Sequence, residues 1–236
     1  MSSGVVLVFD ATTGFLQAIL LDNGFLTELR TGAAGALAAD LLARRDADTV
    51  SIIGCGSQAR YQLEALLDVR RPRRVIVYGR STELAARYAR EMSDRFDVRV
   101  DLAASVQAAV EAGDIVITTT PSREPLVRAE WLRPGTHVTA MGSDGPDKRE
   151  LETAALAKAD KVVADRLDQC LGLGEIHHAV AEGLLDPGRI HGELGELAAG
   201  LVKDVLAGND VEKTVYVEDQ TFTQEQAAEV IDERLY

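Results

Sequence analysis

Short runs of β-branched and other aliphatic residues alternate along this chain with longer segments in which apolar residues recur every three or four positions. The short runs predict strands and the longer segments predict helices. Their regular alternation predicts a doubly wound α/β fold, in which helices cover a parallel sheet, and six strands make up its full sheet. The predicted strands are residues 50–53, 74–78, 98–102, 115–119, 137–141 and 161–164, and the predicted helices between them are residues 58–69, 82–95, 105–112 and 149–159.

The two ends of the chain do not continue this alternation. Residues 5–9 and 15–20 predict a hairpin-like pair of strands around the turn Thr12-Thr13-Gly14, and an Ala- and Leu-rich helix over residues 30–44 leads to the sheet. A closing strand over residues 213–217 and a final helix are predicted at the other end. Because a two-stranded hairpin is only marginally stable alone, these segments are expected to pack on each other, on the core or on a second subunit.

The first strand of the predicted sheet ends directly on Gly54-Cys55-Gly56-Ser57-Gln58-Ala59, where a helical pattern begins. In a dinucleotide site the first glycine allows a tight turn, the second lets the backbone approach the pyrophosphate, and a small residue such as Ala59 lets the helix pack close to the strand. The helix N-terminus then directs amide groups at the phosphate charge. A glycine turn of this spacing also arises by chance, but its strand–turn–helix context favours a dinucleotide site.

The end of the second strand indicates which dinucleotide the site prefers. An NAD site has an acidic residue there, which accepts the ribose hydroxyls. Here Gly79-Arg80-Ser81 follows the strand, and the first acid is Glu83. Arg80 offers a charged fork and Ser81 a hydroxyl donor to a 2′-phosphate, so NADP is favoured over NAD. In the alternative interpretation Arg80 is a solvated surface residue and Ser81 caps the next helix, and the two interpretations are compatible.

Two segments follow the fourth and fifth strands, at the edge where open α/β sheets bind ligands. The first ends in Thr120-Pro121-Ser122, a hydroxyl-rich turn stiffened by proline. The second, Met141-Gly142-Ser143-Asp144-Gly145, holds one acid among small residues, so a ligand can reach it. Asp144 is therefore the first candidate for acid–base chemistry. Its alternative role is that of a turn aspartate that bonds its own backbone.

Arg30 is the second candidate, in the segment Leu29-Arg30-Thr31-Gly32. It lies at the start of the predicted helix 30–44, where the helix dipole disfavours a positive side chain. An anionic ligand would explain its position. In the alternative interpretation Arg30 pairs with Glu28 or Asp40.

Composition and charge exclude several functions. The 236 residues are 46% hydrophobic and 27% charged, which suits one medium domain or a domain with a small appendage. A net charge of −13 without a dense Lys/Arg stripe argues against nucleic acid as a partner. No apolar stretch spans a membrane and no secretory signal opens the chain, so a cytoplasmic protein is expected. Two cysteines make no disulfide framework, and the histidines show no metal-ligand spacing.

Five ordered segments of the chain carry a resemblance to a known family. They are Leu29-Arg30-Thr31-Gly32-Ala33-Ala34, Ile53-Gly54-Cys55-Gly56-Ser57-Gln58-Ala59, Thr119-Thr120-Pro121-Ser122, Leu132-Arg133-Pro134-Gly135-Thr136-His137-Val138, and Gly142-Ser143-Asp144 followed by Lys148-Arg149-Glu150-Leu151. Together they resemble the ornithine cyclodeaminase/mu-crystallin family. The resemblance implies a nicotinamide-binding Rossmann domain inserted into a dimerising substrate domain. It divides the chain into residues 1–45 (part of the substrate domain and the connecting helix), 46–204 (the Rossmann domain) and 205–236 (a return segment).

The resemblance also implies roles for the candidate residues. Arg30 would hold the substrate carboxylate, and Asp144 would exchange protons with the substrate nitrogen and water. Thr31 and the turn Thr120-Pro121-Ser122 would border the cofactor, NADP or NAD. The leading hypothesis is an NAD(P)-dependent oxidoreductase of a small 2-amino or 2-imino acid that acts as a homodimer. The alternatives are a cyclodeaminase-type lyase that releases ammonia and recycles its own NAD, and a non-catalytic NADP-binding protein of the mu-crystallin type.

The chain differs from the family pattern at both ends. Family members normally carry several dozen further N-terminal residues, including a basic pair that completes the carboxylate clamp. Near the other end, Asp219-Gln220-Thr221-Phe222 stands where members usually have a glycine-containing turn. We expect cofactor binding to be retained, because the whole glycine-loop sheet is present. The missing clamp favours the non-catalytic alternative.

Overall fold

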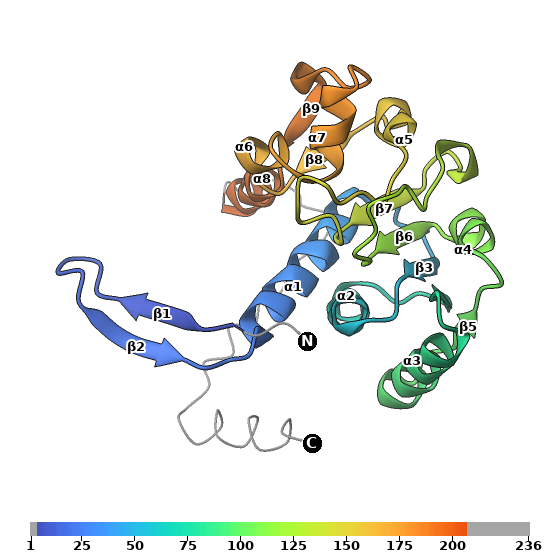
Figure 1. The fold of residues 1–236 in the computed structure, drawn as a ribbon, viewed down its shortest axis with the longest axis horizontal. Coiled ribbons are helices and arrows are strands. Elements are labelled where there is room, and N and C mark those ends of the chain that lie inside the picture. The colour runs from blue at the N-terminus through green and yellow to red at the C-terminus, as the bar shows by residue number, and fades with distance from the viewer. Residues whose placement is uncertain (1–3, 207–236) are drawn as a thin grey trace. The chain divides into compact units, whose positions relative to one another are not determined.

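The computed structural model describes residues 4–206 of the chain (Figure 1). The chain divides into two compact units, Met1–Ala198 and Ala199–Tyr236. Helix α8 spans Leu194–Leu206. The predicted closing strand and final helix lie outside the described residues. The predicted division at residues 45 and 204 stays a prediction.

A five-stranded parallel sheet lies at the centre of the first unit, with the spatial order β5-β4-β3-β6-β7 (Figure 1). Strand β3 pairs with β4 on one side and with β6 on the other, so the strand order reverses between β3 and β6. This is the strand order of a doubly wound dinucleotide fold, and the predicted α/β class is confirmed. The strands are β3 (Thr49–Ile53), β4 (Arg74–Tyr78), β5 (Val100–Leu102), β6 (Ile115–Thr118) and β7 (His137–Ala140).

Helices cover both faces of the sheet, and its central strand β3 is buried on each side. Val50 and Ile52 pack in one core cluster with Leu63, while Ile53 packs in a second cluster with Val110. A strand that is buried on both faces consists mostly of apolar residues in close succession, which is why the sequence pattern located these strands. The crossover helices are α2 (Ser57–Val69), α3 (Thr82–Phe96) and α4 (Val106–Ala112).

The expectation of six strands in one sheet is wrong. The sixth predicted strand exists as β8 (Val162–Ala164), but it pairs in parallel with β9 (Ile190–Glu193) in a separate two-stranded sheet. A short apolar run identifies a strand without identifying its partner, so the pattern could not separate the two sheets. The other elements of this half are α5 (Thr153–Lys158), α6 (Leu167–Cys170), α7 (Gly174–Ala181) and the 3₁₀ turns η1 (Ala129–Trp131) and η2 (Pro187–Arg189).

The predicted helix over residues 149–159 begins four residues later, at Thr153. The backbone before it is already bonded elsewhere: the Val127 N–H donates to the Glu150 carbonyl oxygen (3.0 Å), and Leu151 forms a parallel bridge with Val127. Glu175 accepts hydrogen bonds from the N–H groups of Glu150 and Leu151. These long-range bonds hold the segment extended, and a local helical pattern does not reveal them.

Helix α1 (Phe25–Leu42) begins five residues earlier than predicted. Asn23 and Gly24 take positive φ angles of 50° and 85°, and the Asp22 carboxylate accepts a hydrogen bond from the Leu26 N–H (2.8 Å). The polar turn Asp22-Asn23-Gly24 was the sequence signal for this start. Arg30 therefore lies in the second turn of the helix, and the argument that the helix dipole disfavours it is wrong.

An antiparallel hairpin of β1 (Val6–Phe9) and β2 (Leu16–Leu20) precedes α1, as predicted (Figure 1). Its turn is fixed by Asp10, whose carboxylate accepts hydrogen bonds from the N–H groups of Thr12 and Thr13. Most of its large apolar side chains are exposed. Within residues 4–206 no helix has the length and the apolar character needed to cross a membrane.

Candidate functional site

Four loops meet at the carboxyl edge of the central sheet, and their backbones approach one another closely. A Cβ atom on Gly79, after β4, would lie 2.7 Å from the Cys55 sulfur, and one on Gly54, after β3, would lie 2.6 Å from the Thr119 hydroxyl oxygen. Gly142, after β7, lies against the backbone of Thr120 in the same way. The predicted cofactor loops are therefore neighbours around the point where the strand order reverses.

The glycine loop after β3 has the shape that a pyrophosphate needs. Gly54 takes a φ of +115°, a conformation that a residue with a side chain rarely adopts. Gly56 is exposed, and apart from its chain neighbours no residue lies within 4 Å of the position that its Cβ would take. Helix α2 then begins at Ser57 without a side-chain cap, so its first amide groups are open to an anion. Ala59 is fully buried beneath this turn.

Arg60, in the first turns of α2, binds the carbonyl oxygens of the same loop. It was not among the residues predicted from the sequence. Its Nη1 donates to the carbonyl oxygens of Cys55 and Gly56, each at 2.9 Å. Its other nitrogens make two hydrogen bonds to the Glu91 carboxylate on α3, at 2.9 and 2.6 Å. The hydrogen bond from Arg60 lowers the pKa of Glu91. A guanidinium held in this way fixes the loop and places a positive charge beside it.

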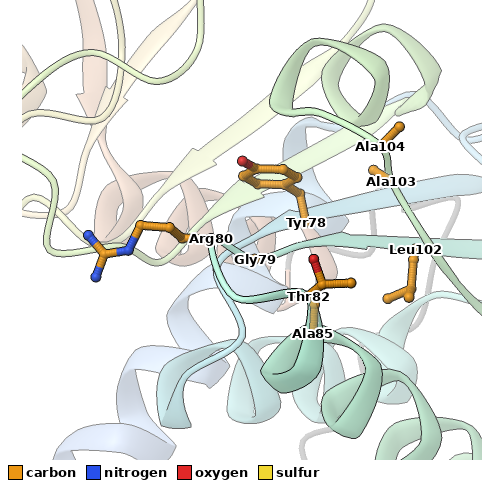
Figure 2. Close-up of a pocket in the computed structure, with 8 residues that line it drawn as sticks. All are labelled: Tyr78, Gly79, Arg80, Thr82, Ala85, Leu102, Ala103 and Ala104. Carbon is orange, nitrogen blue, oxygen red and sulfur yellow. The ribbon is translucent and has the colours of Figure 1, made fainter.

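A pocket of about 240 Å³ opens where β4 and β5 end (Figure 2). Figure 2 shows the Tyr78 ring and the side chains of Leu102 and Thr82 around it, while the Arg80 side chain extends away from them. Arg80 is exposed and forms no ion pair within the described part of the chain. Ser81 caps α3 by accepting a hydrogen bond from the Leu84 N–H (3.3 Å), so the capping interpretation is confirmed. The lining residues are Tyr78, Gly79, Arg80, Thr82, Ala85, Leu102, Ala103 and Ala104.

The loops after β6 and β7 share one buried acid, Glu150. Its Oε1 accepts a hydrogen bond from the Thr120 N–H (2.5 Å), and its Oε2 accepts bonds from the Gly142 N–H (2.8 Å) and the Thr118 hydroxyl (2.7 Å). Glu150 and Thr118 are both 0% exposed. Beyond them the turn continues through Pro121 to Ser122, whose hydroxyl donates to the Glu124 carbonyl oxygen at 2.7 Å.

Glu175, at the start of α7, supports Glu150 through its backbone. The Glu175 carboxylate accepts hydrogen bonds from the N–H groups of Glu150 (2.7 Å) and Leu151 (3.1 Å). Burial raises the pKa of Glu175 to about 7, and the neighbouring Glu150 acts in the same direction. Sequence reasoning missed both acids. Glu150 lies in the segment Lys148-Arg149-Glu150-Leu151, which carries the family resemblance. A residue of the predicted helix 149–159 was not expected to accept hydrogen bonds from the loops after β6 and β7.

The raised pKa of Glu175 predicts that stability falls as pH rises from about 4.5 to about 7. A carboxyl group whose pKa is higher in the folded state binds its proton more tightly there, so its contribution is lost as pH passes the folded value. A shift from 4.5 to about 7 corresponds to about 3 kcal/mol. Urea unfolding at about pH 5 and about pH 8 checks this: wild type should lose stability relative to Glu175→Gln. A difference that does not change with pH would contradict it.

Asp144 lies in an exposed turn after β7. Its side chain is 74% exposed, and one carboxylate oxygen contacts the Lys148 ammonium. The Ser143 hydroxyl donates to the Lys148 carbonyl oxygen at 2.5 Å and closes the same turn. The carboxylate therefore pairs with Lys148. The alternative interpretation, in which the Asp144 side chain bonds its own backbone in the turn, is not what the structure shows. A small ligand can reach Asp144 from solvent.

Arg30 is exposed on α1, and its two proposed partners are bonded elsewhere. Glu28 accepts a hydrogen bond from the Gln58 side chain (2.6 Å), and Asp40 lies 3.5 Å from the Arg70 guanidinium. Gln62 donates to the Thr31 carbonyl oxygen at 2.9 Å, which ties α1 to α2 beside the glycine loop. In the described part of the chain no hydrogen bond or ion pair joins Arg30 to Asp144. The same part holds no cluster of metal-ligating side chains.

The sequence as a whole matches the ornithine cyclodeaminase/mu-crystallin family over residues 1–221. The chain belongs to this family. Its five-stranded parallel sheet, with the glycine loop after β3, is the doubly wound α/β fold of this family member.

Relatives of this family member are similar in both sequence and structure. Alanine dehydrogenase of Archaeoglobus fulgidus is 43% identical over 211 residues, which cover 89% of this chain and 62% of the relative. The structure of Thermococcus litoralis Delta(1)-pyrroline-2-carboxylate reductase in complex with NADH and L-proline matches with a TM-score of 0.79 at 38% identity, covering 84% of this chain and 61% of that one. An archaeal alanine dehydrogenase dimer with bound NAD matches with a TM-score of 0.78 at 39% identity and the same coverage. The chain spans 60% and 66% of the length of two further curated relatives.

Proposed function

We propose that this chain carries the cofactor domain of an NAD(P)-dependent oxidoreductase that acts on a small 2-amino or 2-imino acid. The observation that carries the proposal is the juxtaposition of an open glycine loop and an exposed acid. Gly56 leaves room for a pyrophosphate, and Asp144 stands exposed after β7, in the loop that packs on the Thr120 turn. The relatives named as alanine dehydrogenase and pyrroline-2-carboxylate reductase support it.

Most of the residues that would hold the cofactor lie in the loops at the carboxyl edge of the sheet. The amides of Ser57 and Gln58 would bind the pyrophosphate above Gly56, because the α2 N-terminus has no side-chain cap. Gln58 would act through its backbone, since its side chain bonds Glu28. The adenosine would enter the pocket beside Gly79. Thr31 and the turn Thr120-Pro121-Ser122 would border the other end of the cofactor.

The proposed chemistry uses two side chains of this chain directly. A bound nicotinamide cofactor exchanges a hydride with the α-carbon of the substrate. Arg30 would bind the substrate carboxylate with its planar fork, because it is exposed and has no acidic partner among the described residues. Asp144 would hold and transfer the proton of the substrate nitrogen, and its negative charge would stabilise an iminium.

Cofactor consumption tests this function. NADH and NADPH would be offered with a 2-oxo acid, with ammonium or methylamine, and with both together, while cofactor binding is followed by fluorescence. Consumption that requires both the oxo acid and the amine is expected. Ammonia release from a diamino acid without net cofactor consumption would favour the cyclodeaminase alternative, and binding without either reaction would favour the non-catalytic one.

The preference for NADP rests on Arg80, and its removal is expected to weaken NADPH about 10- to 100-fold while leaving NADH binding nearly unchanged. A charged hydrogen bond to a 2′-phosphate contributes about 1.5–3 kcal/mol, and NADH has no such phosphate. Fluorescence titration of Arg80→Ala with both cofactors measures this. Arg90→Ala, an exposed arginine of α3, is the control. Equal losses for both cofactors would show that Arg80 does not contact the 2′-phosphate.

We propose that the chain forms a homodimer through the β1–β2 hairpin. The hairpin exposes Phe9 (54%), Phe15 (73%) and Ile19 (55%), and such a cluster indicates an interface. Light scattering should give the mass of a dimer, and Phe15→Asp with Ile19→Asp should give a monomer. Leu84→Asp, on an exposed apolar residue of α3, should leave the mass unchanged. A monomeric wild type would refute the proposal.

A further inference from the structure

Glu150 is a fully buried acid to which the proposed chemistry assigns no role. Burying an ionised carboxylate costs free energy unless hydrogen bonds replace its water. Glu150 forms no ion pair with any residue in the range 4–206, and its compensation is the three donors of Thr118, Thr120 and Gly142. Burial raises the pKa of Glu150, while these hydrogen bonds lower it. Only an acceptor with two oxygens can bind all three donors at once.

Two of the three donors are backbone amides from different loops. The Thr120 N–H belongs to the loop after β6, and the Gly142 N–H belongs to the loop after β7. The same two loops touch directly, because a side chain at Gly142 would overlap the Thr120 backbone. The bonds to Glu150 and the direct contact between the loops therefore both fix the distance between the loop after β6 and the loop after β7. Asp144 follows Gly142 by two residues, so its place depends on this anchor.

Glu175 extends the arrangement to helix α7. The Glu175 carboxylate accepts hydrogen bonds from the N–H groups of Glu150 and Leu151. Glu150, which bonds both loops through its side chain, is therefore held in place through its own backbone. Among the facing groups, Arg149 lowers the pKa of Glu175 and Glu150 raises it. The chain of contacts runs from α7 through the backbone of Glu150 to both loops.

We infer that Glu150 is a positioning residue, which holds the loop of Asp144 and the turn Thr120-Pro121-Ser122 at a fixed separation, and that Glu175 holds Glu150 in place. This inference rests on the proposed function, in which Asp144 and the Thr120 turn serve the same reaction. Neither Glu150 nor Glu175 is expected to touch the substrate.

The test compares Glu150→Gln with Thr118→Val in the full chain. The two carboxylate oxygens serve different loops: Oε1 accepts from the Thr120 N–H and Oε2 from the Gly142 N–H. A glutamine has an NH₂ group in one of these two positions, so one loop loses its acceptor. Thr118→Val removes one hydrogen bond from the same carboxylate, but it leaves both loops attached. Both variants weaken the hydrogen bonding at residue 150, but only Glu150→Gln takes the acceptor away from one loop.

Three readouts separate positioning from simple loss of stability. In Glu150→Gln we expect kcat to fall about 10- to 100-fold, with the dissociation constant of NADH or NADPH changed by less than about threefold, because the glycine loop is untouched. The fluorescence gain of bound NADH should decrease, and hydrogen exchange should speed up at residues 118–122 and 141–145. Thr118→Val should keep kcat and exchange within about twofold of wild type.

Wild-type kcat and loop exchange in Glu150→Gln would overturn the inference, and so would equal losses in Thr118→Val. If Glu150→Gln fails to fold, Glu175→Gln replaces it, and the same changes are expected to a smaller extent. A wild type that binds NADH without any turnover would end the proposed function. The exchange and fluorescence comparison would still decide the role of Glu150, so the two failures are distinguishable.

Discussion

Replacing Asp144 by asparagine is expected to lower kcat by about 10²- to 10⁴-fold, the usual contribution of a general acid–base group. Asparagine keeps the size of the side chain but cannot exchange a proton at neutral pH. The residue is 74% exposed in a turn, so the substitution should not disturb the core. Cofactor affinity should stay within about twofold, because the proposed role of Asp144 is to contact the substrate rather than the dinucleotide. Steady-state kinetics and NADH fluorescence titration of the variant measure both quantities.

The matched control is Asp147→Asn, which makes the same substitution three residues further along. Asp147 pairs with Arg123 at 3.2 Å and is 58% exposed, so it resembles Asp144 in charge and setting. Its turnover should remain close to that of wild type. Equal turnover in Asp144→Asn and wild type would remove Asp144 from the mechanism.

Replacing Gly56 by alanine is expected to weaken NADH and NADPH binding by about 100-fold while leaving the melting temperature unchanged or slightly raised. The new methyl group would occupy the open space above the loop, where it would block at least one charged hydrogen bond to the pyrophosphate. Gly56 has φ −81° and ψ −167°, which alanine adopts without strain. Gly→Ala at such a position stabilises a protein by about 0.4–1 kcal/mol. Thermal unfolding and fluorescence titration separate the two effects.

Gly54→Ala is expected to change stability in the opposite direction from Gly56→Ala. Its Cβ would lie 2.6 Å from the Thr119 hydroxyl oxygen at a φ of +115°, so this variant should lose stability by about 1–3 kcal/mol or more. A Gly56→Ala variant that binds both cofactors normally would place the pyrophosphate elsewhere.

Much of the fold could be predicted because its strands are buried on both faces. The runs at β4 and β6 are consecutive apolar residues, β3 is interrupted by the buried Ser51, and the glycine loop follows β3 directly. Pairing partners were harder to predict. Strand β8 has the same apolar character but pairs with β9, and residues 149–152 are extended because distant groups bond their backbone. Such long-range bonds leave no local period in the sequence.

The residues of the candidate site also divide into those that the local sequence predicts and those that only the tertiary structure reveals. Gly54, Gly56 and Asp144 could be found because each follows a strand within a recognisable turn. Arg60 could not be found, since its hydrogen bonds to the loop carbonyls depend on how α2 and α3 pack. Glu150 and Glu175 were missed for a related reason: sequence reasoning expects charged residues at the surface, and their burial depends on donors from three separate segments.

The measurement that tests the proposed reaction most directly is isotope transfer from the cofactor. The chain would be incubated with NADH or NADPH in which both hydrogens at nicotinamide C4 are deuterium, together with a 2-oxo acid and ammonium or with a cyclic imino acid. Mass spectrometry of the product amino acid should find one deuterium at Cα, and this labelled product should form at the rate of cofactor oxidation. In Asp144→Asn the labelled product should form at least about 100-fold more slowly. A product without deuterium, or oxidised cofactor without any amino acid, would contradict hydride transfer to an imino acid at this site.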